Sequence, residues 1–168
     1  SDLNIAFFNP GGLLCGDEEG KFSKKAVQLG REVRLLKDNR GEVDILCISE
    51  SHLREDSVQN VPQKFLGFAW MHETALVNDK AAGVSIGYRW WMPKPMDLLL
   101  QVWKEADNVG TVSALPVELQ DLSKIRGRLQ VVVFQLQELD VIVCNFYGRA
   151  SESLEKRYDM IILATGII

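Results

Sequence analysis

Residues 44–53 read DILCISESHL, a short apolar run that ends abruptly in polar side chains. A run of this length, bounded by polar residues, is typical of a buried strand. Before it, apolar residues recur at helical spacing from Lys21 to Lys37, and a second apolar run occupies residues 3–8. This order of strand, helix and strand predicts an α/β domain or a layered α+β domain.

The following segments predict two β-hairpins. Residues 65–72 and 83–91 are strand-like and are separated by a polar turn at residues 78–80. Residues 128–137 and 139–147 are rich in β-branched side chains and meet at a short acidic turn, which makes them the clearest hairpin in the chain. Two hairpins after a strand–helix–strand unit favour a layered sheet protein.

The segment from residue 96 to residue 127 follows no single pattern. Within it, residues 98–104 and 110–119 fit strands and loops equally well. Residues 150–164 begin with Ser and Glu and then carry apolar residues at helical spacing, which predicts a helix. Without a repeat or a linker, the 168 residues predict a single domain, 1–168.

Composition excludes several classes of function. The net charge of −4 argues against a broad basic face for nucleic acid, although a small metal-assisted phosphate site remains compatible with it. No apolar run is long enough to span a bilayer, so an integral membrane protein is not expected. Two histidines are too few for a histidine-rich metal site.

Cysteine usage predicts the redox state of the protein. The chain has three cysteines, Cys15, Cys47 and Cys144, which are widely spaced and form no CxxC pair. An odd number of cysteines in this arrangement predicts reduced thiols. The first residues do not have the pattern of a secretory signal, so we expect an intracellular protein whose compartment stays open.

Three predicted strands end in side chains that suit phosphate chemistry: Asn9, Glu50 and Tyr147. Sites gather where strand ends and loops converge, a carboxylate can hold Mg²⁺, and a tyrosine hydroxyl can donate to a phosphate oxygen. Each residue also has a simpler interpretation. Glu50 fits a solvated strand end, Asn9 fits a turn before Pro10, and Tyr147 fits the edge of a core.

Five short motifs follow one another along the chain. They are FNPGG (8–12), SES (49–51), GVSI (83–86), GR (127–128) and NFY (145–147). In this order they resemble the N-terminal half of the endonuclease/exonuclease/phosphatase family, and most of all the apurinic-type endonuclease domains of LINE-type retrotransposons. The resemblance runs from about residue 3 to residue 158. It implies a partial four-layer α/β sandwich with its site at one edge, between two sheets.

The resemblance also implies roles for the strand-end residues. Glu50 takes the position of the metal-binding glutamate, with Mg²⁺ as the cofactor. Asn9 takes the position of the asparagine that orients the catalytic aspartate, and Tyr147 that of the tyrosine that contacts the scissile phosphate. The reaction implied is Mg²⁺-assisted hydrolysis of a phosphodiester in DNA or RNA.

The chain departs from the family pattern in its last third. Gly148, Arg149 and Ala150 stand where the family has Ala-Pro-Asn, and the later Gly-Asp-x-Asn and Ser-Asp-His motifs do not occur after Tyr158. The resemblance therefore implies a truncated domain without its C-terminal half, inactive as an isolated chain. The alternative is a non-catalytic subunit with protein partners, because an uncovered sheet face or an unpaired strand edge would need cover.

Overall fold

A computed structural model of the chain describes residues 2–12, 24–62, 64–79, 81–110, 120, 125–149 and 151–165. Several features of the sequence lie outside these residues. They are Cys15, the predicted helix start at residues 21–23, residues 111–119 and Ala150.

The described strands form two sheets. The first has the order β1 (Ile5–Phe8), β2 (Ile45–Ser49), β4 (Val84–Tyr88) and β3 (Ala69–Glu73). The second has the order β5 (Met96–Asp97), β6 (Leu129–Gln135) and β7 (Asp140–Phe146). Strand β1 is parallel to β2, and all other pairs are antiparallel. Both predicted hairpins are confirmed, as β3–β4 and β6–β7.

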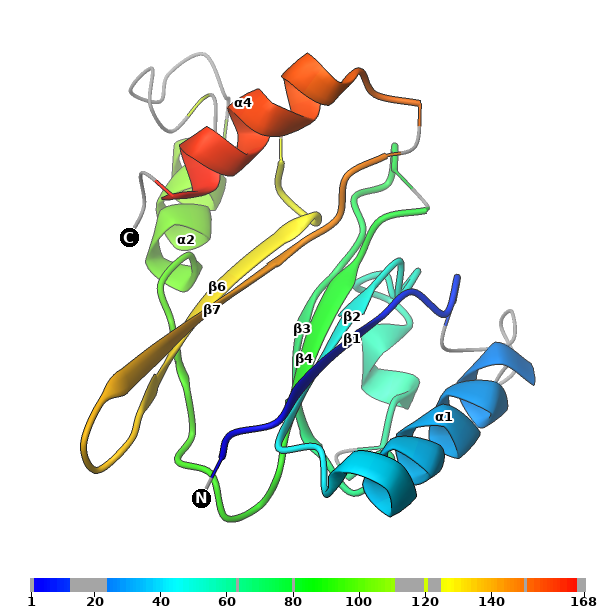
Figure 1. Cartoon of the computed structure of the whole chain (residues 1–168). Helices are drawn as coiled ribbons and strands as arrows, with labels where there is room; N and C mark the ends of the chain where they lie inside the picture. The colour runs from blue at the N-terminus through cyan, green and yellow to red at the C-terminus, as the bar shows by residue number, and fades with distance from the viewer. Residues whose placement is uncertain are drawn as a thin grey trace.

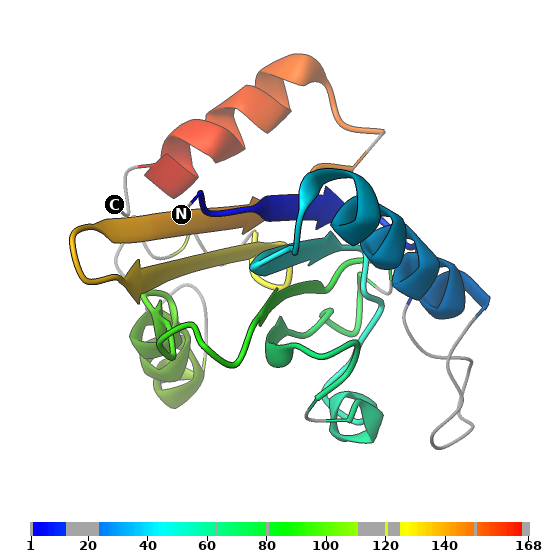
Figure 2. The same cartoon turned by 60° about the horizontal axis from the view of Figure 1, so that its bottom comes forward.

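The two sheets face each other with helices outside them (Figure 1). Helix α1 (Lys24–Arg40) packs on the first sheet through Ala26, Leu29 and Val33. Helices α2 (Leu100–Val109) and α4 (Leu154–Thr165) lie beyond the second sheet (Figure 2). The core between the sheets consists of Ile45, Cys47, Ile86, Met92, Val132, Phe134 and Val143. This arrangement confirms the layered α+β class, and a short helical turn, η1 (Val58–Asn60), follows β2.

Residues 98–104, for which a strand or a loop was expected, enter a helix instead. The Asp97 carboxylate accepts hydrogen bonds from the backbone N–H groups of Leu99 (2.9 Å) and Leu100 (3.1 Å). These bonds satisfy donors that the first helical turn would otherwise leave unpaired. Gly110, with a φ of 79°, then ends helix α2 in the left-handed region. Because residues 98–100 are apolar, the sequence pattern did not reveal that a helix starts after Asp97.

Strands β1 and β7 each have an open edge in the described part of the chain. Strand β1 pairs only with β2, and β7 pairs only with β6. The side chain of Phe7 on β1 is 63% exposed, and Ile142 on β7 is 43% exposed. The sequence led us to expect an uncovered sheet face or an unpaired strand edge. The structure has unpaired strand edges, because the two facing sheets cover each other's inner faces. Within the described residues, no helix has the length and apolar character needed to cross a membrane.

Candidate functional site

The ends of β1, β2 and β7 converge at one edge of the two sheets. Parallel pairing brings the C-terminal ends of β1 and β2 together, so Asn9 and Glu50, which directly follow these strands, are neighbours. Tyr147 follows β7 and reaches the same place from the facing sheet. We call these residues, Asn9, Glu50 and Tyr147, the strand-end cluster.

The Glu50 carboxylate is the centre of this cluster. Asn9 donates from Nδ2 to Glu50 Oε1 at 2.8 Å, and the Tyr147 hydroxyl is hydrogen-bonded to the Glu50 side chain. The backbone N–H of Gly11 donates to Asn9 Oδ1 at 3.1 Å, which orients the amide so that its NH₂ group faces Glu50. The structure therefore brings all three sequence-predicted residues together around one carboxylate.

The environment of Tyr147 keeps its hydroxyl protonated. Burial raises the pKa of Tyr147, and the hydrogen bond to Glu50 and the negative charge of that carboxylate raise it further. A phenol whose pKa lies above its ordinary value of about 10 is neutral at physiological pH. Tyr147 can therefore act as a hydrogen-bond donor.

Unusual backbone angles direct Glu50 toward the cluster. Glu50 and His52 have φ values of 53° and 56°, in the left-handed region that non-glycine residues rarely adopt. The Glu50 carbonyl accepts a hydrogen bond from Gly12 N–H at 2.8 Å, and His52 N–H donates to the Ala82 carbonyl at 3.1 Å. Strained backbone of this kind persists where surrounding contacts impose it, often at functional sites.

His52 also lies beside the cluster, at the surface of the protein. Its Nε2 is 3.7 Å from Glu50 Oε2, and its side chain is 38% exposed. It thus borders the carboxylate from the solvent side.

A buried ion pair fixes the position of Tyr147. Arg128 donates from Nε to the Tyr147 carbonyl at 2.9 Å and from Nη1 and Nη2 to the two carboxylate oxygens of Glu152, at 2.9 and 2.7 Å. The side chains of Arg128 and Glu152 are only 5% and 7% exposed. The Gly-Arg motif therefore holds the end of β7 in place. Sequence reasoning missed the role of Glu152, which carries no local signal.

Asn145 sets the distance between the sheets near the cluster. It is 2% exposed, and its Nδ2 donates to the carbonyls of Ile48 (3.0 Å) and Ser85 (3.1 Å) in the opposite sheet. Because Asn145 precedes Tyr147 by two residues and Ile48 precedes Glu50 by two, this bond helps hold the two strand ends together.

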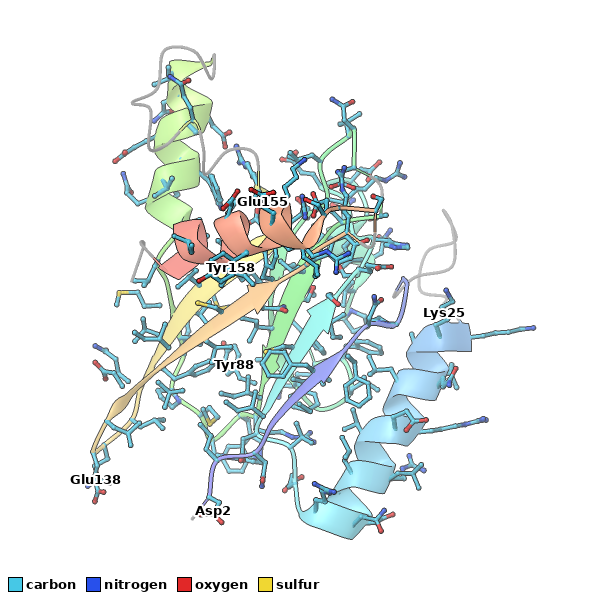
Figure 3. The ribbon with its side chains drawn as sticks, turned by 45° about the horizontal axis from the view of Figure 1, so that its top comes forward. Asp2, Lys25, Tyr88, Glu138, Glu155 and Tyr158 are labelled. Atoms are coloured by element: carbon cyan, nitrogen blue, oxygen red, sulfur yellow. The ribbon has the colours of Figure 1, made fainter. Side chains whose placement is uncertain are left out.

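Two cations border the cluster. Lys25, at the first turn of α1, donates from Nζ to the Gly11 carbonyl at 3.2 Å (Figure 3). Arg149 forms an ion pair with Asp79, and this hydrogen-bonded carboxylate raises the pKa of Arg149. Sequence reasoning treated Arg149 only as a departure from a family motif, and it placed Asp79, which is 70 positions away in the chain, only in a polar turn.

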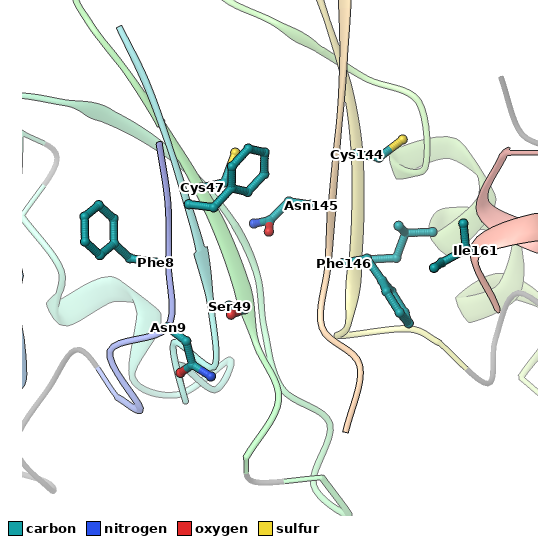
Figure 4. Close-up of a pocket in the computed structure, with 10 residues that line it drawn as sticks. Phe8, Asn9, Cys47, Ser49, Cys144, Asn145, Phe146 and Ile161 are labelled. Atoms are coloured by element: carbon teal, nitrogen blue, oxygen red, sulfur yellow. The ribbon is translucent and has the colours of Figure 1, made fainter. Parts of the chain in front are cut away.

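Two cavities meet at Asn9. One of about 520 Å³ opens between β1 and β2 on one side and β7 and α4 on the other (Figure 4). Its lining residues are Phe7, Phe8, Asn9, Cys47, Ser49, Leu129, Cys144, Asn145, Phe146 and Ile161. The other, of about 500 Å³, lies toward α1 and includes Glu50, Lys25 and Glu32. The first is mainly apolar, and the second carries the charged groups.

Glu50 has the donor chemistry that Mg²⁺ prefers, a carboxylate oxygen. Among the residues that the structure describes, no group of three or more His, Cys, Asp or Glu side chains could hold a metal ion. Mg²⁺ commonly keeps several waters and is held by one or two carboxylates together with substrate phosphates. A Mg²⁺ ion held in that manner would have Glu50 as its protein ligand.

A third cavity, of about 930 Å³, is lined by residues 54–56, which follow the Glu50 loop, and by two half-buried titratable groups, His72 and Glu73. Burial raises the pKa of Glu73 to about 7, against the opposing charge of Arg126. Burial lowers the pKa of His72 to about 4, and its Nδ1 is 2.7 Å from Ser85 Oγ. At pH 7 the His72 imidazole is therefore neutral, whereas the Glu73 carboxyl is neutral below about pH 7 and ionised above it.

Replacing Glu73 by Gln is expected to stabilise the protein at pH 8. The folded-state pKa of Glu73 is raised, so its contribution to stability is complete below pH 4.5 and is lost as the pH rises through about 7. The Gln variant cannot ionise and should exceed the wild type by about 2 kcal/mol in free energy of unfolding at pH 8. At pH 4 the two proteins should be equal. Urea unfolding at both pH values tests this. If the free energies of unfolding of the variant and the wild type differ by the same amount at pH 4 and at pH 8, the prediction is wrong.

The fold has solved counterparts. No protein-family model and no curated protein matches the sequence. The AP endonuclease LMAP from Leishmania major matches with a TM-score of 0.51 and 14% identity over 94% of this chain and 43% of its own. The catalytic domain of APE2 from Xenopus laevis matches with a TM-score of 0.50 and 16% identity over 97% of this chain and 50% of its own. The chain thus spans about half the length of these structures.

Proposed function

We propose that this chain, which has the fold of the endonuclease/exonuclease/phosphatase proteins, supplies the metal- and phosphate-binding half of a site that hydrolyses phosphodiesters in DNA or RNA inside the cell. The observation that carries the proposal is the convergence of Asn9 and Tyr147 on the Glu50 carboxylate. Three strands that are distant in sequence deliver these side chains to one place.

Each residue has a defined task in this proposal. Glu50 would hold Mg²⁺, which when bound supplies stabilisation of the negative charge on the phosphate. Tyr147, kept protonated by burial and by Glu50, would donate its hydroxyl proton to a phosphate oxygen in a hydrogen bond. Asn9, held by Gly11 N–H, keeps Glu50 oriented and would orient the catalytic aspartate that the resemblance implies.

Hydrolysis also requires a group that activates water. The resemblance assigns this task to an aspartate and a histidine in motifs that do not occur after Tyr158 in this sequence. We therefore propose that these groups come from another polypeptide segment, either of the same protein or of a partner.

The 168-residue chain alone is then expected to leave supercoiled plasmid intact in the presence of Mg²⁺. Gel electrophoresis of the plasmid after incubation with purified chain measures this. A Glu50→Gln preparation made in parallel reports any contaminating nuclease. Metal-dependent nicking by the wild-type chain that disappears in this variant would contradict the expectation of an incomplete site.

A non-catalytic role in a protein assembly is a second candidate, favoured by the open strand edges. Ile5 and Phe7 on β1 are 38% and 63% exposed, and β1 borders the mainly apolar cavity between the sheets. Exposed strand edges with apolar side chains readily pair with other chains. This role predicts that tagged protein co-purifies from its native cells with a stoichiometric partner, and that charged substitutions at Phe7 release it. A monodisperse, monomeric protein without partners would contradict this role.

A further inference from the structure

Arg149 presents a positive charge to solvent beside the strand-end cluster. It follows Tyr147 by two residues in the chain. Its own side chain is 43% exposed, whereas that of its partner Asp79 is only 13% exposed. The carboxylate therefore lies behind the guanidinium, and the guanidinium faces outward.

The backbone around this pair is firmly held. The N–H of Arg149 donates to Glu152 Oε2 at 3.1 Å, the same carboxylate that binds Arg128. The turn that carries Asp79 is closed by a bond from Ala82 N–H to the Asp79 carbonyl at 3.0 Å. The Ala82 carbonyl in turn accepts the N–H of His52 at 3.1 Å, in the loop after Glu50. Hydrogen bonds thus connect the ion pair of Arg149 and Asp79 to the segment after Tyr147 and to the loop after Glu50.

The side chains around Tyr147 carry negative charge. An anionic substrate would therefore bind better with a further positively charged side chain beside them. Glu50 and Asp79 both contribute negative charge there, because Glu50 is the centre of the cluster and Asp79 is paired with Arg149, two residues after Tyr147. The charge of Arg128 is already neutralised by Glu152 in a buried bidentate pair. Arg149 is the exposed guanidinium of this group. A guanidinium has five N–H donors, so it can keep a carboxylate on one side and bind a phosphate on another.

We propose that Arg149 binds the phosphate adjacent to the one at the strand-end cluster, so that the substrate is a nucleic-acid strand with consecutive phosphates. An isolated diester or a phosphate monoester would not engage this side chain. Asp79 positions the guanidinium by holding it from behind. The inference rests on the proposed function for the location of the reacting phosphate, but it concerns binding and is tested without hydrolysis.

The test is fluorescence anisotropy with a fluorescein-labelled single-stranded oligonucleotide, in Mg²⁺ and over a series of KCl concentrations. Arg149→Ala should weaken binding about tenfold at low salt. It should also reduce the slope of log K against log salt concentration by about 0.7, the value for one phosphate contact on a single strand. Arg149→Lys should preserve the slope and lose part of the affinity, because an ammonium keeps the charge without the planar fork.

Arg34→Ala is the matched control, because it removes an exposed arginine from the surface of α1. It should change the affinity and the salt slope less than Arg149→Ala does. Thermal unfolding of all variants confirms that they are folded. Equal affinity and slope in Arg149→Ala, Arg34→Ala and the wild type would overturn the inference, as would a wild type that does not bind the oligonucleotide. Binding that depends on Arg149 without hydrolysis by any complete form of the protein would overturn only the proposed function.

Discussion

Replacing Glu50 by Gln should reduce Mg²⁺-dependent phosphodiester cleavage by at least about 100-fold in protein that combines this chain with its water-activating residues. The amide has the shape of the carboxylate and keeps one oxygen, but it loses the charge that holds a divalent cation. Glu50 accepts hydrogen bonds from Asn9 and Tyr147, and the single amide oxygen of Gln can keep at least one of them, so the isosteric side chain still fits between the strand ends. The initial rate of plasmid nicking measures the effect.

Glu32→Gln is the matched control for this substitution. Glu32 lines the same cavity as Glu50 but lies on α1, away from the strand ends. The control should retain wild-type activity within a factor of about three, since a surface charge change alone has a small effect. If Glu50→Gln cleaves as fast as Glu32→Gln, the glutamate does not hold the metal ion.

The largest expected effect on stability comes from the ion pair between Arg128 and Glu152. Arg128→Met should lower the free energy of unfolding by about 3–5 kcal/mol, because it leaves the buried Glu152 carboxylate without its partner. The end of β7 should also loosen, since Arg128 binds the Tyr147 carbonyl. Urea unfolding at pH 7 measures the loss of stability.

The double variant, Arg128→Met with Glu152→Met, separates the cost of an unpaired buried charge from the cost of losing the contacts that Arg128 makes. Without either charge no unpaired ion remains, so the double variant should be more stable than Arg128→Met alone. It should still bind substrate more weakly than the wild type, because Tyr147 and Arg149 both lose an anchor. If the double variant is less stable than the single one, the cost is not one of an unpaired buried charge.

The sequence was sufficient to predict β1, β2, both hairpins and the three strand-end residues that the structure brings together. Strands with uninterrupted apolar runs are recognisable locally, and the polar residue after each run is visible in the sequence. Parallel pairing of β1 with β2 then places Asn9 beside Glu50 without further information. The proximity of these two residues could therefore be predicted before any contact was known.

The supporting contacts could not be predicted, because their partners are far apart in the chain. Arg128 and Glu152 are separated by 24 positions, and nothing near Glu152 distinguishes it from a solvated helix-start residue. The pairing of Asp79 with Arg149 depends on how the turn after β3 meets the end of β7. Helix α2 was missed because its apolar start resembles a strand and its cap, Asp97, acts through backbone N–H groups.

The central claim is that the strand-end cluster binds a divalent cation through Glu50. Paramagnetic line broadening by Mn²⁺, a substitute for Mg²⁺ at oxygen sites, tests it directly on the ¹⁵N-labelled chain. At substoichiometric Mn²⁺, we expect broadening to centre on the backbone amides around Asn9, Glu50 and Tyr147, to be reversed by excess Mg²⁺, and to vanish in Glu50→Gln. Broadening centred elsewhere, or unchanged in Glu50→Gln, would contradict the claim.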